Sequence, residues 1–275
     1  MSYLTTTDNI NLFYEKHGEG ETLIFCHGLN SSHNVNFDFY NEFRDDYQVI
    51  LYDQRGHGDS DRATGHMNVK RLGQDLNDII ESLDLDDVTL IGHSMGAATI
   101  YSYVDQFGCD KLKRIVASDM SPYMRNDGWK GGIAQGKWSD EDFMEDFDRI
   151  FDDVGYAAYY ITKNIMDPRL SSITKEEEYE LIKQYGKATD AFTMASFWYS
   201  LFRSDQRPAI DKITVPFMYI MPDYPLYSMD AVDYLRNHVK SDFVLENDFS
   251  NTTHAIWRQM PHEVACAIKD FINNF

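Results

Sequence analysis

Residues 88–98 read V-T-L-I-G-H-S-M-G-A-A, and this stretch decides the fold. The apolar run at 88–91 has the length and composition of a buried β-strand, and small residues suited to a helix follow from Gly96. Between them lies G-H-S-M-G at 92–96, a G-x-S-x-G sequence. A serine on a sharp strand-to-helix turn points its hydroxyl out of the sheet, and side chains two residues away would collide there. The stretch therefore predicts a nucleophilic Ser94 beside the N-terminal amides of a helix.

Strand and helix patterns alternate on both sides of this stretch. The expected strands cover 3–6, 10–16, 22–26, 47–52, 88–91, 112–118, 215–221 and 242–246. The expected helices of the same region cover 34–43, 68–83, 96–107, 231–239 and 261–273. Strands that alternate with helices form crossover units, so we expect an α/β fold with a mostly parallel sheet.

The alternation stops between residues 121 and 210, where only helical patterns occur, at 140–153, 174–185 and 190–202. We therefore expect two parts. Residues 1–120 and 211–275 would form the α/β core, and residues 121–210 would form an inserted helical cap. The apolar residues of 192–202 could pack against the core or line a substrate cleft, and the sequence leaves both possibilities open.

Composition limits the classes of partner. The chain has 45 acidic and 25 basic residues, a formal net charge of −20. This charge repels nucleic acid and anionic membranes, so neither is an expected partner. The three cysteines, Cys26, Cys109 and Cys266, have no C-x-x-C spacing, which is typical of reduced thiols in a cytoplasmic protein. We see no secretion signal, and no apolar run approaches the ~20 residues that span a bilayer.

Several motifs occur in a characteristic order: H-G-L-N at 27–30, D-Q-R-G-H-G-D-S at 53–60, G-H-S-M-G at 92–96, and a late histidine. Across nearly its whole length the chain resembles the α/β-hydrolase fold. This resemblance implies a mostly parallel, eight-stranded sheet flanked by helices, with an inserted helical cap. A looser resemblance, to the cofactor-free haloperoxidase and small-ester esterase branch, comes from D-M-S-P at 119–122, N-D-G-W at 126–129 and P-L-Y-S at 225–228.

A serine hydroxyl needs a base, because it keeps its proton at neutral pH. We choose His254, which lies in the loop after the last strand and satisfies the chain order serine, acid, histidine. His262 lies within a helix pattern and is a weaker candidate. A carboxylate must then hold the imidazole. Asp119 at the end of one strand is favoured, and Asp223 after the next strand remains the alternative.

The remaining site residues are expected around these groups. The backbone amides of Leu29 and Met95 are the expected oxyanion donors. We expect the substrate pocket to be bordered by four residues, namely His93, Trp129, Phe197 and Trp198. His93 is also expected to pack under the turn. The chain shows no metal-ligand spacing, phosphate-binding glycine loop or dinucleotide fingerprint, so we expect no cofactor and no metal.

These residues predict a serine hydrolase that cleaves small, mostly apolar carboxylic esters through an acyl-enzyme, with water as the second reactant. Three alternatives stay open: a perhydrolase or haloperoxidase on the same triad, a carbon–carbon bond hydrolase, and a non-catalytic member that binds a small molecule. Dehalogenase and epoxide hydrolase functions are disfavoured, because those branches need an aspartate where this chain has Ser94.

Overall fold

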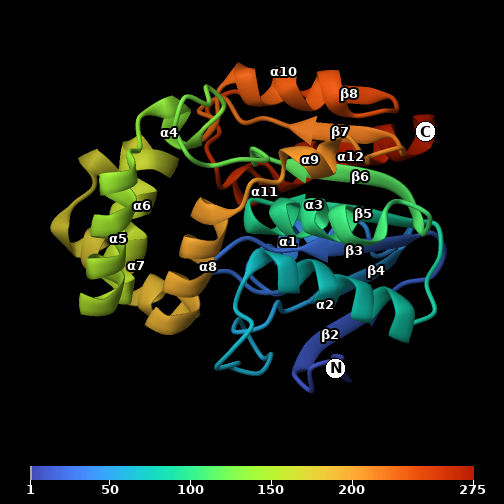
Figure 1. Ribbon diagram of the computed structural model, residues 1–275, viewed down its shortest axis with the longest axis horizontal. Helices are drawn as coiled ribbons and strands as arrows, with labels where there is room; N and C mark the ends of the chain where they lie inside the picture. Colours follow the sequence, from blue (N-terminus) through green and yellow to red (C-terminus); the bar gives the residue numbers. More distant parts are fainter. Residues whose placement is uncertain (1) are drawn as a thin grey trace.

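A computed structural model describes residues 2–275. Eight strands form one sheet in the order β1-β2-β4-β3-β5-β6-β7-β8, with β1 and β2 antiparallel to their neighbours and the other pairs parallel (Figure 1). The prediction of a mostly parallel, eight-stranded sheet is therefore confirmed. The strands are β1 (Ser2–Thr5), β2 (Asn11–His17), β3 (Thr22–Cys26), β4 (Gln48–Tyr52), β5 (Val88–His93), β6 (Leu112–Ser118), β7 (Phe217–Ile220) and β8 (Phe243–Glu246).

The central strands are rich in apolar residues because both faces of the sheet are covered. In β5, Leu90 pairs with Ile24 of β3 and Ile115 of β6, and these three face one hydrophobic core. The next residue along, Ile91, faces the other core with Phe25. Successive side chains of a strand point to opposite faces, so one short run of sequence supplies both cores.

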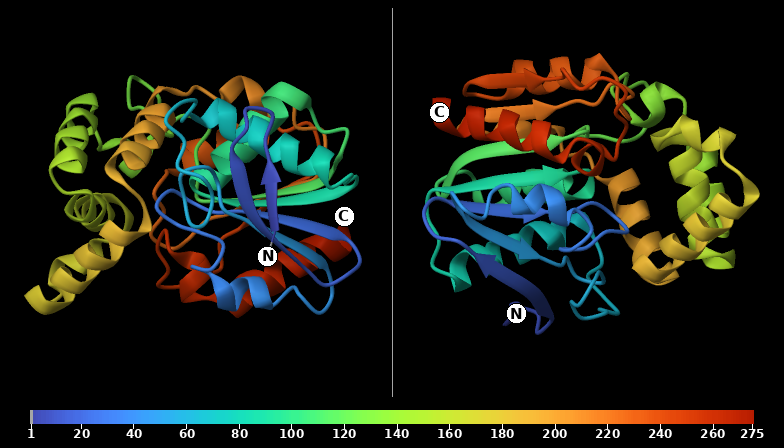
Figure 2. Two further views of the ribbon diagram at one scale, coloured as in Figure 1. Left: turned by 90° about the horizontal axis from the view of Figure 1, so that it is seen from below. Right: turned by 180° about the vertical axis from the view of Figure 1, so that it is seen from behind.

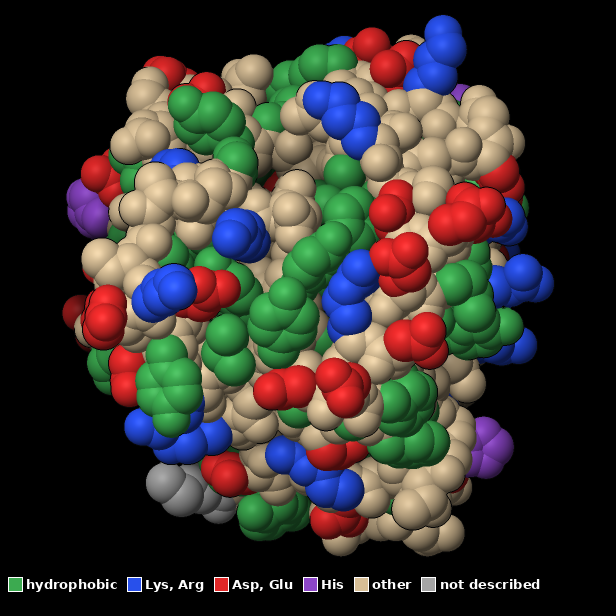
Figure 3. All heavy atoms as spheres, turned by 90° about the vertical axis from the view of Figure 1, so that its left-hand side faces the viewer, with side chains coloured by type: hydrophobic (Ala, Val, Ile, Leu, Met, Phe, Trp, Pro, Cys, Tyr) green, Lys and Arg blue, Asp and Glu red, His purple; other side chains and the backbone are tan. Residues whose placement is uncertain are grey.

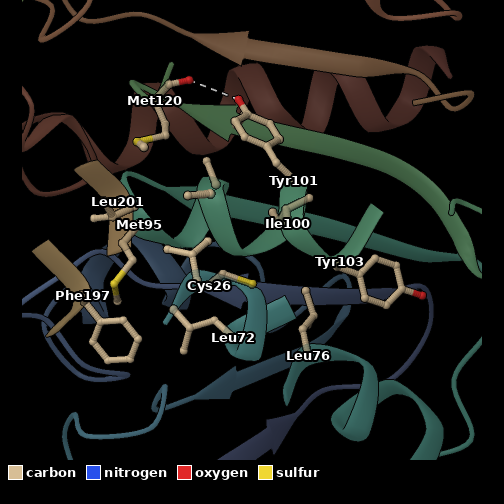
Figure 4. Packing of buried hydrophobic residues seen from close by; sticks show 14 of the residues in the cluster. Cys26, Leu72, Leu76, Met95, Ile100, Tyr101, Tyr103, Met120, Phe197 and Leu201 are labelled. Carbon is tan, nitrogen blue, oxygen red and sulfur yellow. Dashed lines mark hydrogen bonds between the residues drawn. The ribbon is translucent and has the colours of Figure 1, made fainter. Parts of the chain in front are cut away.

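Helices cover the two faces of the sheet, as the two turned views show (Figure 2). Helices α2 and α3 pack together on one face, where Leu72 and Leu76 contact the core around Cys26 and Met95 (Figure 4). Helices α1 and α12 pack together on the other face. The core helices are α1 (Phe37–Asn41), α2 (Val69–Ser82), α3 (Met95–Phe107), α9 (Arg207–Ile210), α10 (Met229–His238), α11 (Ile256–Gln259) and α12 (Pro261–Asn274).

The chain between β6 and α9 forms a group of helices beside the sheet (Figure 1). They are α4 (Ile133–Gly136), α5 (Asp140–Asp152), α6 (Val154–Ile161), the π-helix η1 (Thr162–Met166), the 3₁₀-helix η2 (Pro168–Ser172), α7 (Lys175–Ala188) and α8 (Ala191–Arg203). A buried carboxylate joins α5 and α8 to the loop between α4 and α5, because Asp146 Oδ2 accepts from the indole nitrogens of Trp138 at 3.0 Å and Trp198 at 3.1 Å. The outer face of this group carries both signs of charge with hydrophobic side chains between them (Figure 3).

Among residues 2–275, no helix combines the length and the apolar character needed to cross a membrane.

Candidate active site

Ser94 occupies the turn between β5 and α3 in a strained conformation, with φ 55° and ψ −123°. The two flanking glycines are required by space. A Cβ on Gly96 would overlap the carbonyl of Cys26, and a Cβ on Gly92 would lie 2.7 Å from the backbone nitrogen of Ala97. The strand, the turn and the helix together hold this serine in place, which is how strained backbone persists at functional sites.

His254 lies in the loop that follows β8, and its ring is held by Asp119. Nδ1 of His254 is 2.7 Å from Oδ2 of Asp119, whose side chain is fully buried at the end of β6. The backbone N–H of Leu226 also donates to the two carboxylate oxygens, at 3.1 and 3.2 Å. Because the carboxylate accepts from Nδ1, the neutral ring keeps its proton there and Nε2 is left as a proton acceptor.

Asp223, the other candidate acid, is not brought to His254. Its side chain is exposed and accepts a hydrogen bond from the backbone N–H of Asn251 at 2.8 Å. The backbone N–H of Asp223 donates to Thr252 Oγ1 at 3.1 Å. Asp223 therefore ties the end of β7 to the loop that carries His254, without contacting the imidazole.

His93 packs under the turn and supports His254. Its Nε2 donates to the carbonyl oxygen of His254 at 2.6 Å, and the two ring centroids are 4.6 Å apart. Burial, followed by the neighbouring His254, lowers the pKa of His93 to about 3. His93 is therefore neutral at physiological pH, and it fixes the backbone of His254 from below the pocket.

Ser94 and His254 border the same cavity, together with Gly28, Leu29 and His93. Of the aromatic residues expected in the pocket, Trp198 lines it. The other side chains that line it are mainly apolar and come from the loops after β6 and β7 and from the helical segment: Met120, Met124, Ile133, Met166, Leu170, Leu181, Leu201, Leu226 and Tyr227. Three of these residues fall within motifs quoted from the sequence, Met120 in D-M-S-P and Leu226 and Tyr227 in P-L-Y-S. The motifs indicate a family resemblance but do not predict that these side chains form the cavity wall.

Two of the expected pocket residues lie elsewhere. Phe197 is fully buried with its ring centroid 5.7 Å from that of His57, because it projects from a different face of α8 than Trp198 does. Trp129 packs edge-on against Tyr234 at 5.2 Å and under the guanidinium of Arg207 at 5.3 Å, outside the cavity. The prediction that Phe197 and Trp129 line the pocket is therefore wrong.

The two expected oxyanion donors are the residue after Ser94 and a residue that lines the cavity. Met95 is the first residue of α3, and the N–H groups of a helix's first turn have no acceptor within the helix. Leu29 lines the cavity directly after Gly28. A Cβ on Gly28 would lie 3.3 Å from Cβ of Ser94 and 3.2 Å from Nδ1 of His93, so the backbone of the 27–30 loop approaches the serine closely.

One group of side chains in the described residues has atoms close enough to hold a metal ion: His33, Asp53 and Asp59, whose possible ligand atoms lie within 4.8 Å of one another. The carboxylate of Asp53 is already used within the protein. It accepts from the backbone N–H of His33 at 2.6 Å, from His33 Nδ1 at 2.8 Å and from the backbone N–H of Asp59 at 2.8 Å. We assign this group to bracing of the two loops.

Comparison with known proteins agrees with this fold. A family model described as alpha/beta hydrolase fold matches residues 21–222. A non-heme chloroperoxidase of Kitasatospora aureofaciens is 34% identical over 123 residues, which are 44% of this chain and 45% of that protein. The matched segment thus spans about half the length of the curated relatives.

Two solved structures share the fold over nearly the whole chain. An esterase from Exiguobacterium antarcticum has a TM-score of 0.84 at 17% identity and covers 99% of both chains. A bromoperoxidase from Bacillus anthracis also has a TM-score of 0.84, at 20% identity, with 99% of this chain and 100% of that one covered. At these identities the likeness shows the fold, and the site must be argued from its own residues.

Proposed function

Because the chain belongs to the α/β-hydrolase fold family, we propose that it is a serine hydrolase that cleaves small, mostly apolar carboxylic esters through an acyl-enzyme. The observation that carries the proposal is the arrangement of three side chains. A buried carboxylate, Asp119, holds the Nδ1 of His254, and His254 borders the same cavity as the strained Ser94. A carboxylate, an imidazole and a serine hydroxyl in this order are what acyl transfer requires.

In the first half of the reaction, Ser94 Oγ attacks the ester carbonyl while Nε2 of His254 takes the hydroxyl proton. The imidazolium that forms keeps its hydrogen bond to Asp119, which stabilises the positive charge. The carbonyl oxygen becomes an oxyanion beside the amides of Leu29 and Met95. His254 then gives the proton to the departing alcohol, and the acyl group remains on Ser94.

In the second half, water attacks the acyl-enzyme and His254 accepts its proton, so the acid leaves and Ser94 regains its hydroxyl. Hydrogen peroxide in place of water would give a peracid by the same steps. The similarity to a non-heme chloroperoxidase supports such a perhydrolase activity beside ester hydrolysis. Peracid formation would use the same serine, histidine and aspartate.

The apolar cavity wall supports the substrate class. The side chains of Met120, Met124, Leu201 and Leu226 line it and offer no charge to a bound acyl chain. Trp198 forms part of the wall and is itself anchored through its indole N–H to the buried Asp146. We propose that the helices of the cap thereby set the size of the acyl group that fits.

The test is turnover of p-nitrophenyl acetate and p-nitrophenyl butyrate by the wild-type protein and by Ser94→Ala. We expect measurable turnover that Ser94→Ala abolishes, together with Ser94-dependent labelling by a fluorophosphonate. Ser241→Ala, which changes a serine between α10 and β8, is the matched control and should keep full activity. Absence of both turnover and labelling would favour a binding protein, and activity confined to a vinylogous diketone would favour a carbon–carbon bond hydrolase.

A further inference from the structure

The cavity that holds Ser94 has one cationic side chain at its edge, and the proposed ester hydrolysis does not use it. Arg258 lies in α11, four residues after His254, and it lines the cavity with an exposed side chain. No carboxylate of residues 2–275 lies within ion-pair distance of its guanidinium, although most arginines in this acidic chain do pair with one. A guanidinium in this position presents donors to whatever enters the cavity.

Resting on the proposed function, we propose that Arg258 binds an anionic group of the substrate, so that the preferred esters carry a carboxylate at the end remote from the scissile bond. Arg is suited to this role because its planar donors match a carboxylate in two parallel hydrogen bonds.

The topology gives the cavity two different ends. Met120 and Met124 follow β6, and Leu226 and Tyr227 follow β7, so the apolar wall lies on the β6–β7 side of Ser94. Strand β3 lies on the other side of β5. Helix α11 contacts α1, which follows β3, and Trp257 of α11 stacks on Phe39 of α1 at 4.7 Å. Arg258 therefore belongs to the β3 side, opposite the apolar wall.

The lining residues on the β3 side are more polar, which agrees with an ionic substrate end. Ser31 and Asn36, both in the loop between β3 and α1, line the cavity there, beside the apolar Leu29 and Val35 of the same loop. Tyr185 of α7 lines the same cavity. Burial raises the pKa of this phenol, and the positive charge of Arg258 opposes that rise. Hydroxyl and amide groups beside a guanidinium can complete the hydrogen bonding of a bound carboxylate.

The carboxylate among the lining residues, Asp167, is already paired with an arginine. Asp167 borders the cavity, but Arg169 binds both of its carboxylate oxygens, at 2.8 Å and 2.7 Å. Arg258 therefore remains as the uncompensated charge of the lining at neutral pH. The net charge of −20 repels anions at long range, yet salt screens such charges beyond about 8 Å at physiological ionic strength. At the edge of the cavity, the positive charge of Arg258 therefore attracts an anionic substrate group more strongly than the distant acidic residues repel it.

Two matched ester pairs test the inference, each with a carboxylate in one member and a carboxamide in the other. The first pair, p-acetoxybenzoate and p-acetoxybenzamide, carries the difference on the leaving group. The second pair, monomethyl adipate and methyl adipamate, carries it on the acyl group. We expect wild-type kcat/KM to favour the carboxylate about five- to tenfold in at least one pair, the size of a partly exposed ion pair.

The substitution Arg258→Gln should remove this preference while kcat/KM for the neutral amide stays within about twofold of wild type. Arg203→Gln is the matched control, because Arg203 is an exposed arginine at the end of α8 that does not line the cavity. It should keep the preference. The inference is overturned if the wild-type protein prefers neither carboxylate, or if Arg258→Gln lowers both members of each pair equally.

A binding measurement separates this inference from the proposed reaction. In Ser94→Ala, calorimetry with p-acetamidobenzoate and p-acetamidobenzamide should show tighter carboxylate binding, and adding Arg258→Gln should weaken it about fivefold. If ester turnover is absent while this difference holds, the hydrolase proposal fails and the anion site stands. If turnover is present while neither assay distinguishes carboxylate from carboxamide, the anion site fails alone.

Discussion

Nδ1 of His254 lies 2.7 Å from Oδ2 of Asp119, although the two residues are 135 positions apart in the chain. The contact forms because Asp119 ends β6 and the loop after β8 reaches back across the end of β7 to meet it. The carboxylate is buried and also receives the N–H of Leu226. An acid held in this way cannot turn away from the imidazole without leaving a buried donor unpaired.

Because Asp119 contacts His254 and Asp223 does not, substitutions of the two aspartates should have different effects on the reaction rate. Asp119→Asn should lower kcat for p-nitrophenyl butyrate about a thousandfold or more, because an amide at this position can leave His254 in the wrong tautomer. Asp223→Asn keeps a side-chain oxygen that can accept the loop hydrogen bond from Asn251, and it should keep kcat within about threefold. Steady-state kinetics of the two variants side by side decide between them. A crippled Asp223→Asn beside an active Asp119→Asn would contradict the assignment.

The hydrogen bond from His93 to the carbonyl of His254 predicts a positioning role. His93→Phe keeps a ring between His254 and Trp257 but removes the donor, so we expect kcat to fall about tenfold with KM little changed. The free energy of unfolding should fall by about 1 kcal/mol, the size of one hydrogen bond.

The pH–rate profile supplies the discriminating readout for His93. The pKa of His93, about 3, keeps its imidazole neutral from pH 5 upward, so His93 does not change its charge over the pH range of the assay. The acidic limb of kcat/KM should therefore keep its midpoint in His93→Phe. A midpoint displaced by a full pH unit would mean that His93 takes part in proton transfer.

The close approach of the 27–30 loop to Ser94 predicts the effect of a single methyl group. In Gly28→Ala the new Cβ would press on Ser94 Cβ at 3.3 Å and on His93 Nδ1 at 3.2 Å. The loop must shift by a few tenths of an ångström, which would move the Leu29 amide away from its proposed place beside the oxyanion. We expect kcat/KM to fall about ten- to a hundredfold with a cooperative unfolding transition retained. Gly65→Ala, whose Cβ would meet no atom within 4 Å, is the control and should remain fully active.

The place of Ser94 could be predicted because it depends on local sequence at the end of a strand. His254 is indicated by its loop after the last strand and by the chain order serine, acid, histidine. For the acid, the sequence favours Asp119 but leaves Asp223 open. Asp119 and Asp223 each follow a strand of the same sheet edge, and the choice depends on which carboxylate the later loop reaches. That loop is fixed by tertiary contacts, including the hydrogen bond from His93 to the carbonyl of His254, which no local pattern encodes.

The pocket wall was harder to predict than the triad for a geometric reason. Phe197 and Trp198 are neighbours in sequence, yet successive residues of a helix point about 100° apart, so only one of them reaches the cavity. The segment Val154–Ile161 is apolar nearly all round and shows no clear period, so α6 was not predicted. The π-helix that follows α6 contributes Thr162 and Met166 to the cavity wall. The spacing of apolar residues in the sequence does not distinguish a π-helix from an α-helix over so short a segment.

Behind the wall, the buried Asp146 predicts a pH-dependent stability. Burial, opposed by hydrogen bonds from Trp138 and Trp198, raises the pKa of this carboxyl to about 6 from 3.8. Between pH 3.8 and about pH 6, Asp146 is mostly protonated in the folded protein and mostly ionised in the unfolded chain. Stability therefore falls as the pH rises through this range, and Asp146 favours folding more at pH 5 than at pH 7.5. From the two pKa values, this group should add about 1 kcal/mol to the free energy of unfolding at pH 5 relative to pH 7.5.

Other carboxylates change stability over the same pH range, so the measurement must be a difference between two proteins. Urea denaturation of the wild type and of Asp146→Asn at both pH values gives it. The wild type should gain about 1 kcal/mol on the variant when the pH is lowered, and a constant difference would show that Asp146 ionises alike in both states.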